Sequence, residues 1–219
     1  DPREIASLND PNNLTSSFSK NLYIASTALV QNGIDDPQSE QETINQLLKK
    51  EAEKVQPTTY TSQDVKLGTS DSSSSLKLYG NAVALILNGL ITEQTITEDL
   101  MSVGKYTSTG NESDLAVLIR SSANLSEALQ KLRLLSVPPS AVSIHIQILN
   151  TLGTFANTVT GLSHAYEDPV RATLAFNRYP NDAVAVLQSF PRLSAFFASK
   201  NITYTSKEAG YIYVVGYTK

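Results

Sequence analysis

The sequence predicts a mainly α-helical protein, a single-domain bundle of about seven helices around one central helix, with a small C-terminal β-hairpin. Apolar residues recur at steps of three and four through most of the chain, which is the period of an α-helix. Pro-Pro and Asp-Pro pairs separate these stretches and are typical of helix starts. Only the end of the chain, from residue 201, is rich in tyrosine and β-branched residues at strand-like spacing.

The central helix is expected over residues 139–167. A proline disfavours helical conformation in the residue before it, so Pro138 and Pro139 end the preceding helix, and Pro139 can enter the first turn of the next. Two adjacent apolar stripes cover about half of this helix's circumference, which predicts that other helices pack around it. Asp168 and Pro169 then form the cap and the first position of a following helix.

The remaining elements follow from the same signals of period, cap and proline. Residues 1–13 are expected to form a loosely ordered stalk, residues 14–200 the bundle, and residues 56–75 a Ser/Thr-rich loop within it. Helices flank the loop and continue after it, with expected spans of 14–29, 38–55, 76–90, 95–103, 111–132, 169–176 and 180–197. Pro191 should kink or split the last of these.

The C-terminal segment 201–219 is predicted to be a β-hairpin that leans on the helices. Its second strand places Tyr211, Tyr213 and Tyr217 on one face by the period of two. That face serves either to dock the hairpin on the bundle or to bind a partner, since tyrosine is favoured at interfaces.

Composition excludes several classes of function. The net charge of -4 and the pI near 5.2 argue against nucleic acid as a partner, because phosphate binding needs a basic face. The chain has no cysteine, so disulfides, thiolate chemistry and Cys-ligated metals are excluded. A polar, weakly charged surface rich in Ser, Thr and Asn favours a location outside the cytoplasm.

The two histidines are the residues with the most chemical potential. His145 falls inside the apolar arc of the central helix, where it is either a neutral core residue with a hydrogen-bond partner or a buried base or pH switch. His164 has the i,i+4 spacing of a metal pair with Asp168, but Asp168 serves as the cap and no third ligand is visible. Nucleotide-binding loops and zinc-protease motifs are absent from the sequence. No catalytic residue, cofactor or metal is therefore predicted.

A candidate interaction surface lies on the helix 38–55. Its apolar stripe is narrow and its flanks are charged, as at the rim of a reversible interface. The stripe consists of Ile44, Leu47, Leu48 and Val55.

The central stretch carries a resemblance. The run Val-Pro-Pro-Ser-Ala-Val-Ser-Ile-His-Ile-Gln-Ile-Leu-Asn, followed by Tyr-Glu-Asp-Pro-Val-Arg-Ala at 166–172, resembles a family of uncharacterised exported helical proteins of ultra-small, reduced-genome bacteria. The similarity covers residues 75–200, and its motifs are structural rather than catalytic. The resemblance implies a membrane anchor ahead of Asp1 and a domain outside the cytoplasmic membrane, but no activity.

These observations lead to two functional hypotheses. The first is a non-enzymatic, extracytoplasmic interaction or structural module of the cell envelope, whose partner is another envelope protein and whose contact with the membrane is a segment upstream of Asp1. The second is an envelope enzyme or solute-binding protein with a groove near His145 or His164. A pocket with converging polar groups would favour the second, whereas a smooth bundle would favour the first.

Overall fold

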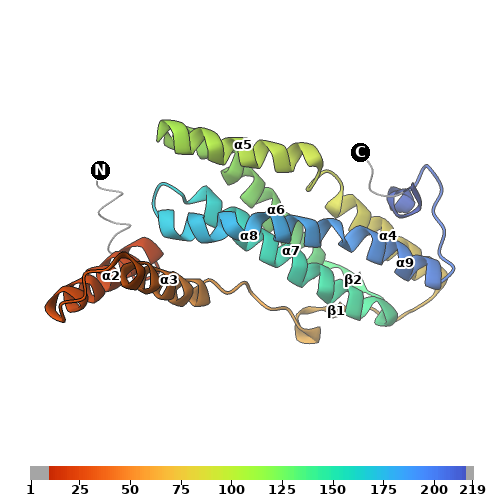
Figure 1. The fold of residues 1–219 in the computed structure, drawn as a ribbon. Coiled ribbons are helices and arrows are strands. Elements are labelled where there is room, and N and C mark those ends of the chain that lie inside the picture. The colour runs from red at the N-terminus through yellow and green to blue at the C-terminus, as the bar shows by residue number, and fades with distance from the viewer. Residues whose placement is uncertain (1–9, 216–219) are drawn as a thin grey trace. The chain divides into compact units, whose positions relative to one another are not determined.

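The computed structural model describes residues 10–215 and confirms the predicted mainly α-helical fold. Helices, labelled as in Figure 1, make up most of this part of the chain. The sequence predicted one bundle, whereas the chain divides into two compact units. Unit 1 contains residues 10–56 and 161–177, and unit 2 contains residues 57–160 and 178–215.

Unit 1 is built on a helical hairpin. Helices α2 (Leu14–Gln31) and α3 (Pro37–Lys54) run antiparallel and are joined by a short turn. The turn contains Gly33 with φ 67°, a left-handed conformation that glycine adopts without steric cost. The end of α7 (Val142–Ser163) and the first half of α8 (Pro169–Leu187) complete the unit.

The hairpin covers its inward side chains only in part, for example Phe18, Leu22 and Leu47. Between residues 16 and 50 no side chain is buried, although every residue of that range is described. The helices are instead well capped, since Asn13 accepts a hydrogen bond from the Ser16 amide and Asp36 accepts one from the Ser39 amide. Local signals therefore define these two helices more than a core does.

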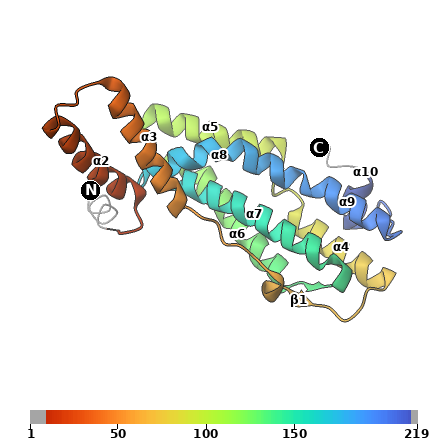
Figure 2. The same cartoon turned by 60° about the horizontal axis from the view of Figure 1, so that its bottom comes forward.

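Unit 2 has a dense apolar core. It contains α4 (Ser73–Leu87), α5 (Glu93–Thr109), η2 (Glu112–Leu115), α6 (Ala116–Leu134), α7 up to Thr160, the second half of α8 and α9 (Ser189–Ser199). Helices α6 and α7 lie side by side in both views (Figures 1 and 2). The core residues that are almost fully buried are Val83, Leu118, Leu132, Leu149, Leu152 and Leu193.

The loop 56–75 is tied to the start of α7. After η1 (Ser62–Asp64), strand β1 (Lys66–Leu67) pairs in parallel with β2 (Ser136–Val137), in the register Lys66 to Ser136. Pro138 is buried, and Pro139 begins η3 (Pro139–Ala141), which leads into α7. The prolines thus end one helix in extended backbone and start the next, as their chemistry requires.

Two helices continue beyond the residues expected to end them. Helix α5 runs through Gly104 and ends at Gly110, whose φ of 66° makes it the left-handed cap. Helix α8 runs through Pro180, and the break falls instead at Gln188. Pro191 then occupies the first turn of α9, where its missing N–H removes no helical hydrogen bond.

The prediction of a C-terminal β-hairpin is wrong for the described residues of this segment. Residues 201–215 form irregular backbone followed by η4 (Ala209–Tyr211) and α10 (Ile212–Val215). Burial of tyrosines against unit 2 overrides strand propensity here. The ring of Tyr204 lies so close to Gly210 that a β-carbon there would clash with it, and the Tyr213 hydroxyl donates a hydrogen bond to the Gly80 carbonyl. Tyr213 and Tyr211 do not share one exposed face, because Tyr213 is buried and Tyr211 is partly buried.

Candidate functional site

The most connected polar group of unit 1 is the carboxylate of Asp168, which lies in the turn between α7 and α8. Pro169 occupies the first position of α8, and Asp168 caps that helix by accepting the Arg171 amide at 3.2 Å. The Asp168 amide in turn donates to the His164 carbonyl at 2.8 Å, which closes the turn. The Asp-Pro pair therefore starts α8 by local chemistry alone.

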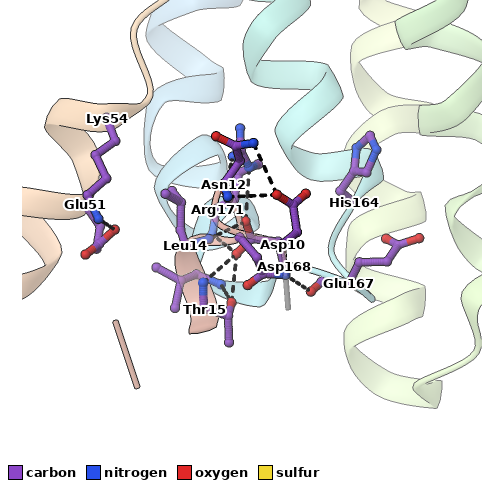
Figure 3. Close-up of polar contacts among 12 residues, drawn as sticks. Asp10, Asn12, Leu14, Thr15, Glu51, Lys54, His164, Glu167, Asp168 and Arg171 are labelled. Atoms are coloured by element: carbon purple, nitrogen blue, oxygen red, sulfur yellow. Dashed lines mark hydrogen bonds and ion pairs between the residues drawn. The ribbon is translucent and has the colours of Figure 1, made fainter. Parts of the chain in front are cut away.

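The same carboxylate also caps the helical hairpin (Figure 3). The backbone amides of Leu14 and Thr15, in the first turn of α2, each donate to Asp168 at 2.9 Å, and the Thr15 hydroxyl donates at 2.8 Å. The Thr15 oxygen then accepts the Val170 amide at 2.9 Å. One side chain thus satisfies free amides at the N-termini of two helices.

Arg171 completes the cluster. Its Nε donates to Asp168 at 3.1 Å and its guanidinium also donates to the Asn12 carbonyl at 2.8 Å. Burial alone would raise the pKa of the Asp168 carboxyl, but the hydrogen bonds from Leu14, Thr15 and Arg171 outweigh it and lower that pKa below its ordinary value. The group is therefore a stable buried anion.

This geometry suits a structural role better than a chemical one. Every oxygen of Asp168 already accepts hydrogen bonds, so none is left to take a proton or bind a cation. Within residues 10–215 no group of three or more His, Asp or Glu side chains is close enough together to hold a metal ion. His164 is exposed, and its Nδ1 lies 3.2 Å from the Ser163 hydroxyl, to which it is hydrogen-bonded.

His145 lies in the core of unit 2, far from solvent. It is 0 % exposed, and its Nδ1 is hydrogen-bonded to the Tyr79 hydroxyl at 3.0 Å. Burial lowers the pKa of His145 to about 4, although the Leu132 carbonyl counteracts part of the shift. The ring is therefore neutral near pH 7. No solute can reach it unless the core opens.

A second buried acid, Asp99, was not predicted from the sequence. It is 4 % exposed and accepts hydrogen bonds from the hydroxyls of Ser121 at 2.7 Å and Tyr179 at 2.8 Å. Burial raises the pKa of Asp99, and the two hydrogen bonds offset only part of the rise. The signal in the sequence is faint: the inward face of α5 carries Asp99 and Ser102 where an apolar stripe would be expected.

The hairpin contains its own buried charge. Glu51, near the end of α3, is fully buried, and its carboxylate accepts hydrogen bonds from the Ser17 hydroxyl at 2.9 Å and from Lys54 at 2.7 Å. Lys54 also donates to the Ser17 oxygen at 2.7 Å. These bonds join the start of α2 to the end of α3, so the hairpin is held together at its base (Figure 3 shows Glu51 and Lys54).

The candidate interaction surface on α3 is half covered. The four stripe residues, Ile44, Leu47, Leu48 and Val55, are partly buried, since α3 packs along α2. The most exposed apolar side chains of the hairpin lie on α2 and in the turn after it: Tyr23 is 76 % exposed and Val30 74 %, and Ile24 and Ile34 are also exposed. Tyr217 lies outside the described residues.

Three grooves of unit 2 are open and lined more by apolar than by polar surface. Two grooves flank α10: one of about 440 Å³ is lined by α9 and the segment 201–204, and one of about 390 Å³ is lined by the end of α8, α9 and α10 itself. A third, of about 350 Å³, lies between α4 and α6, where Glu127 and Lys131 form an ion pair at its edge. None of these three grooves brings together a nucleophile and a base.

Comparison of the chain with protein-family models, curated proteins and solved structures finds no match. We therefore infer the function from the geometry of the described residues.

Proposed function

We propose that this chain is a non-enzymatic interaction module of the cell envelope, and that the α2–α3 hairpin is the element that binds its protein partner. One observation carries the proposal. The hairpin fully buries no side chain between residues 16 and 50, and it exposes large apolar side chains on α2, Tyr23 and Val30 foremost. Such surfaces on water-soluble helices mark contact sites.

The energetics of the hairpin support this role. Helices of 18 residues, the length of both α2 and α3, are marginally stable in water by themselves, and most helical stability in proteins comes from packing an apolar face. Here the bonds of Asp168 and Glu51 secure the base of the hairpin, but its far half has caps and little burial. A partner that covers α2 would supply the missing burial.

The envelope location rests on composition and resemblance. The surface is rich in Ser, Thr and Asn with few charges, and the central stretch resembles exported proteins. Within the part of the chain that the structure describes, no helix combines the length and the apolar character needed to cross a bilayer. Contact with the membrane through a segment ahead of Asp1 is part of the proposal.

The enzyme or solute-binding alternative has weaker support. His145 is sealed in the core, and the carboxylate of Asp168 is occupied by hydrogen bonds from α2 and α8. His164 is exposed, and it does not line any of the three grooves of unit 2. The interaction role is the one for which a suitable surface exists.

Site-specific photo-crosslinking in cells that make the full-length protein tests the proposal. A crosslinker at Val30 should give a defined protein adduct in the envelope fraction, while one at the equally apolar, exposed Val184 of α8 should give none. Equal adducts at both positions, or recovery of the full-length protein in the soluble cytoplasmic fraction, would refute it.

A further inference from the structure

We propose that the partner of the hairpin is a second copy of this chain, paired antiparallel through α2 about a two-fold axis near Thr27. The inference rests on the proposed function, because it assumes that the hairpin is an interaction element. Thr27 is exposed in the middle of the outward face of α2. The large side chains Tyr23, Ile24 and Val30 lie one helical turn to either side of it.

The charge of the outward face favours self-pairing. The exposed positions of α2 are Ser19, Lys20, Tyr23, Ile24, Thr27, Ala28, Val30 and Gln31, and Lys20 is their one charged side chain. A two-fold interface places the same patch on both copies. A charged side chain near the axis would therefore face the identical charge of the second copy and be repelled. The centre of this face has none. A membrane-surface helix would instead carry several cations on its polar side, which α2 lacks.

The antiparallel direction follows from the charges at the two ends of the face. Lys20 lies two turns before Thr27, and Asp35 lies exposed in the turn that follows the opposite end of α2. Two copies that run antiparallel about Thr27 bring Lys20 of each copy towards Asp35 of the other. In a parallel pair each Lys20 would face its own equivalent, which is unfavourable. Ile24 of one copy then packs against Val30 of the second copy.

The paired surface is smaller than a standard interface, so the dimer should be weak and should depend on protein concentration. The α2 helix of 18 residues is about 27 Å long and about 10 Å wide, so the face that it offers projects to roughly 270 Å² when the shape of the side chains is left out. Standard interfaces bury about 800 Å² per partner. In this arrangement the two α2 helices pair at the centre and each α3 lies on the outer side of its own α2.

Cysteine crosslinking of the full chain tests the geometry. The sequence has no native cysteine, so an introduced cysteine can form a disulfide only with its equivalent in a second copy. Residues on a two-fold axis approach their own equivalents, so Thr27→Cys should give a reducible dimer under mild oxidation. Gln46→Cys, at an exposed position of α3, is the matched control and should crosslink at least about tenfold more slowly. Equal rates for the two variants would overturn the proposed axis.

Charge reversal tests the register by sedimentation equilibrium. Lys20→Asp and Asp35→Lys should each weaken the dimer by about tenfold in Kd, since each dimer contains two such pairs, and the double variant should restore the wild-type value. Ile24→Glu should give a monomer, while Leu85→Glu, at an exposed position of α4, should not. A wild-type chain that stays monomeric at every concentration would overturn self-pairing. An adduct to a different envelope protein in the photo-crosslinking experiment would still uphold the broader proposal.

Discussion

The α2–α3 hairpin and the helices of unit 2 have similar lengths but opposite sources of stability. Unit 2 has a core of leucines and valines with almost no exposure, and its central helix α7 is covered on several sides. The hairpin has no fully buried side chain over residues 16–50, and polar bonds at its base add to the partial packing of α3 on α2. One part of the chain thus provides its own core, and the other presents a face that still needs covering.

The two buried aspartates show the same contrast at the level of single groups. Asp168 and Asp99 have the same exposure, 4 % each, yet the pKa of Asp168 is lowered and that of Asp99 is raised. Asp168 receives three backbone amides, a hydroxyl and a guanidinium, whereas Asp99 receives two hydroxyls. Burial determines the pKa only where donors are few.

The largest expected effect is on the core of unit 2. Leu152→Ala should lower the free energy of unfolding by about 2–5 kcal/mol, because it removes packed methyl groups from the most buried helix. The exposed Leu134→Ala, on α6, is the control and should change stability by less than about 0.5 kcal/mol. Chemical denaturation measures both. Equal losses would mean that the core does not dominate the stability of unit 2.

Asp168→Ala should cost about 2–4 kcal/mol, because first-turn amides of two helices lose their acceptor and Arg171 loses its carboxylate partner. The loss should be largest in the hairpin, which amide exchange resolves residue by residue. Because the folded pKa of Asp168 is lowered, its contribution is present above the unfolded pKa and is lost as the pH falls through the folded pKa. A variant as stable as the wild type would show that the cluster is incidental.

His145 makes unit 2 sensitive to acid. Its folded pKa of about 4 is below the ordinary 6.5, so the unfolded chain takes up a proton first as the pH falls. The free energy of unfolding should therefore fall between pH 6.5 and pH 4, by at most about 3 kcal/mol. Below pH 4 the contribution of His145 to this fall should level off. His145→Gln, which does not titrate, should lose this dependence. An identical pH profile in the variant would contradict the assignment.

Asp99→Asn should have the smallest effect. The raised pKa means that the ionised carboxylate is disfavoured in the fold, so this group costs stability as the pH rises above its unfolded pKa. The neutral Asn side chain removes that cost, but its NH₂ group is a donor placed against hydroxyls, those of Ser121 and Tyr179, that also donate. We therefore expect the free energy of unfolding to change by no more than about 1 kcal/mol at pH 7. Urea denaturation at pH 7 measures it, and a loss of several kcal/mol would show that the charge is needed.

The parts of the fold that depend on local chemistry could be predicted from the sequence. Asp168 and Pro169 specify a helix start through their own backbone geometry, and the stripes of α6 and α7 specify buried faces. The second role of Asp168 could not be predicted, because Leu14 and Thr15 are more than 150 residues away in the chain. The hydrogen bond from Tyr179 to Asp99 joins residues that are 80 positions apart in the chain, so it could not be predicted from the sequence either.

In the C-terminal segment, tertiary packing outweighs the strand propensity of the local sequence. The alternation from Tyr211 to Val215 has strand propensity, but the helical turn places Tyr213 against α4 and α9, where its carbonyl accepts a hydrogen bond from the Ser194 hydroxyl. Its ring packs against Phe197 at a centroid distance of 5.1 Å. Propensity scales contain neither contact.

Amide hydrogen exchange on the dilute and the concentrated full chain tests the central contrast most directly. Amides of the far half of the hairpin, residues 23–48, should exchange quickly in dilute solution, while those of 148–152 in α7 are strongly protected. Raising the protein concentration should slow exchange in the hairpin alone, because a second copy then covers α2. Strong protection of residues 23–48 in a dilute monomer would contradict the claim that the hairpin needs a partner.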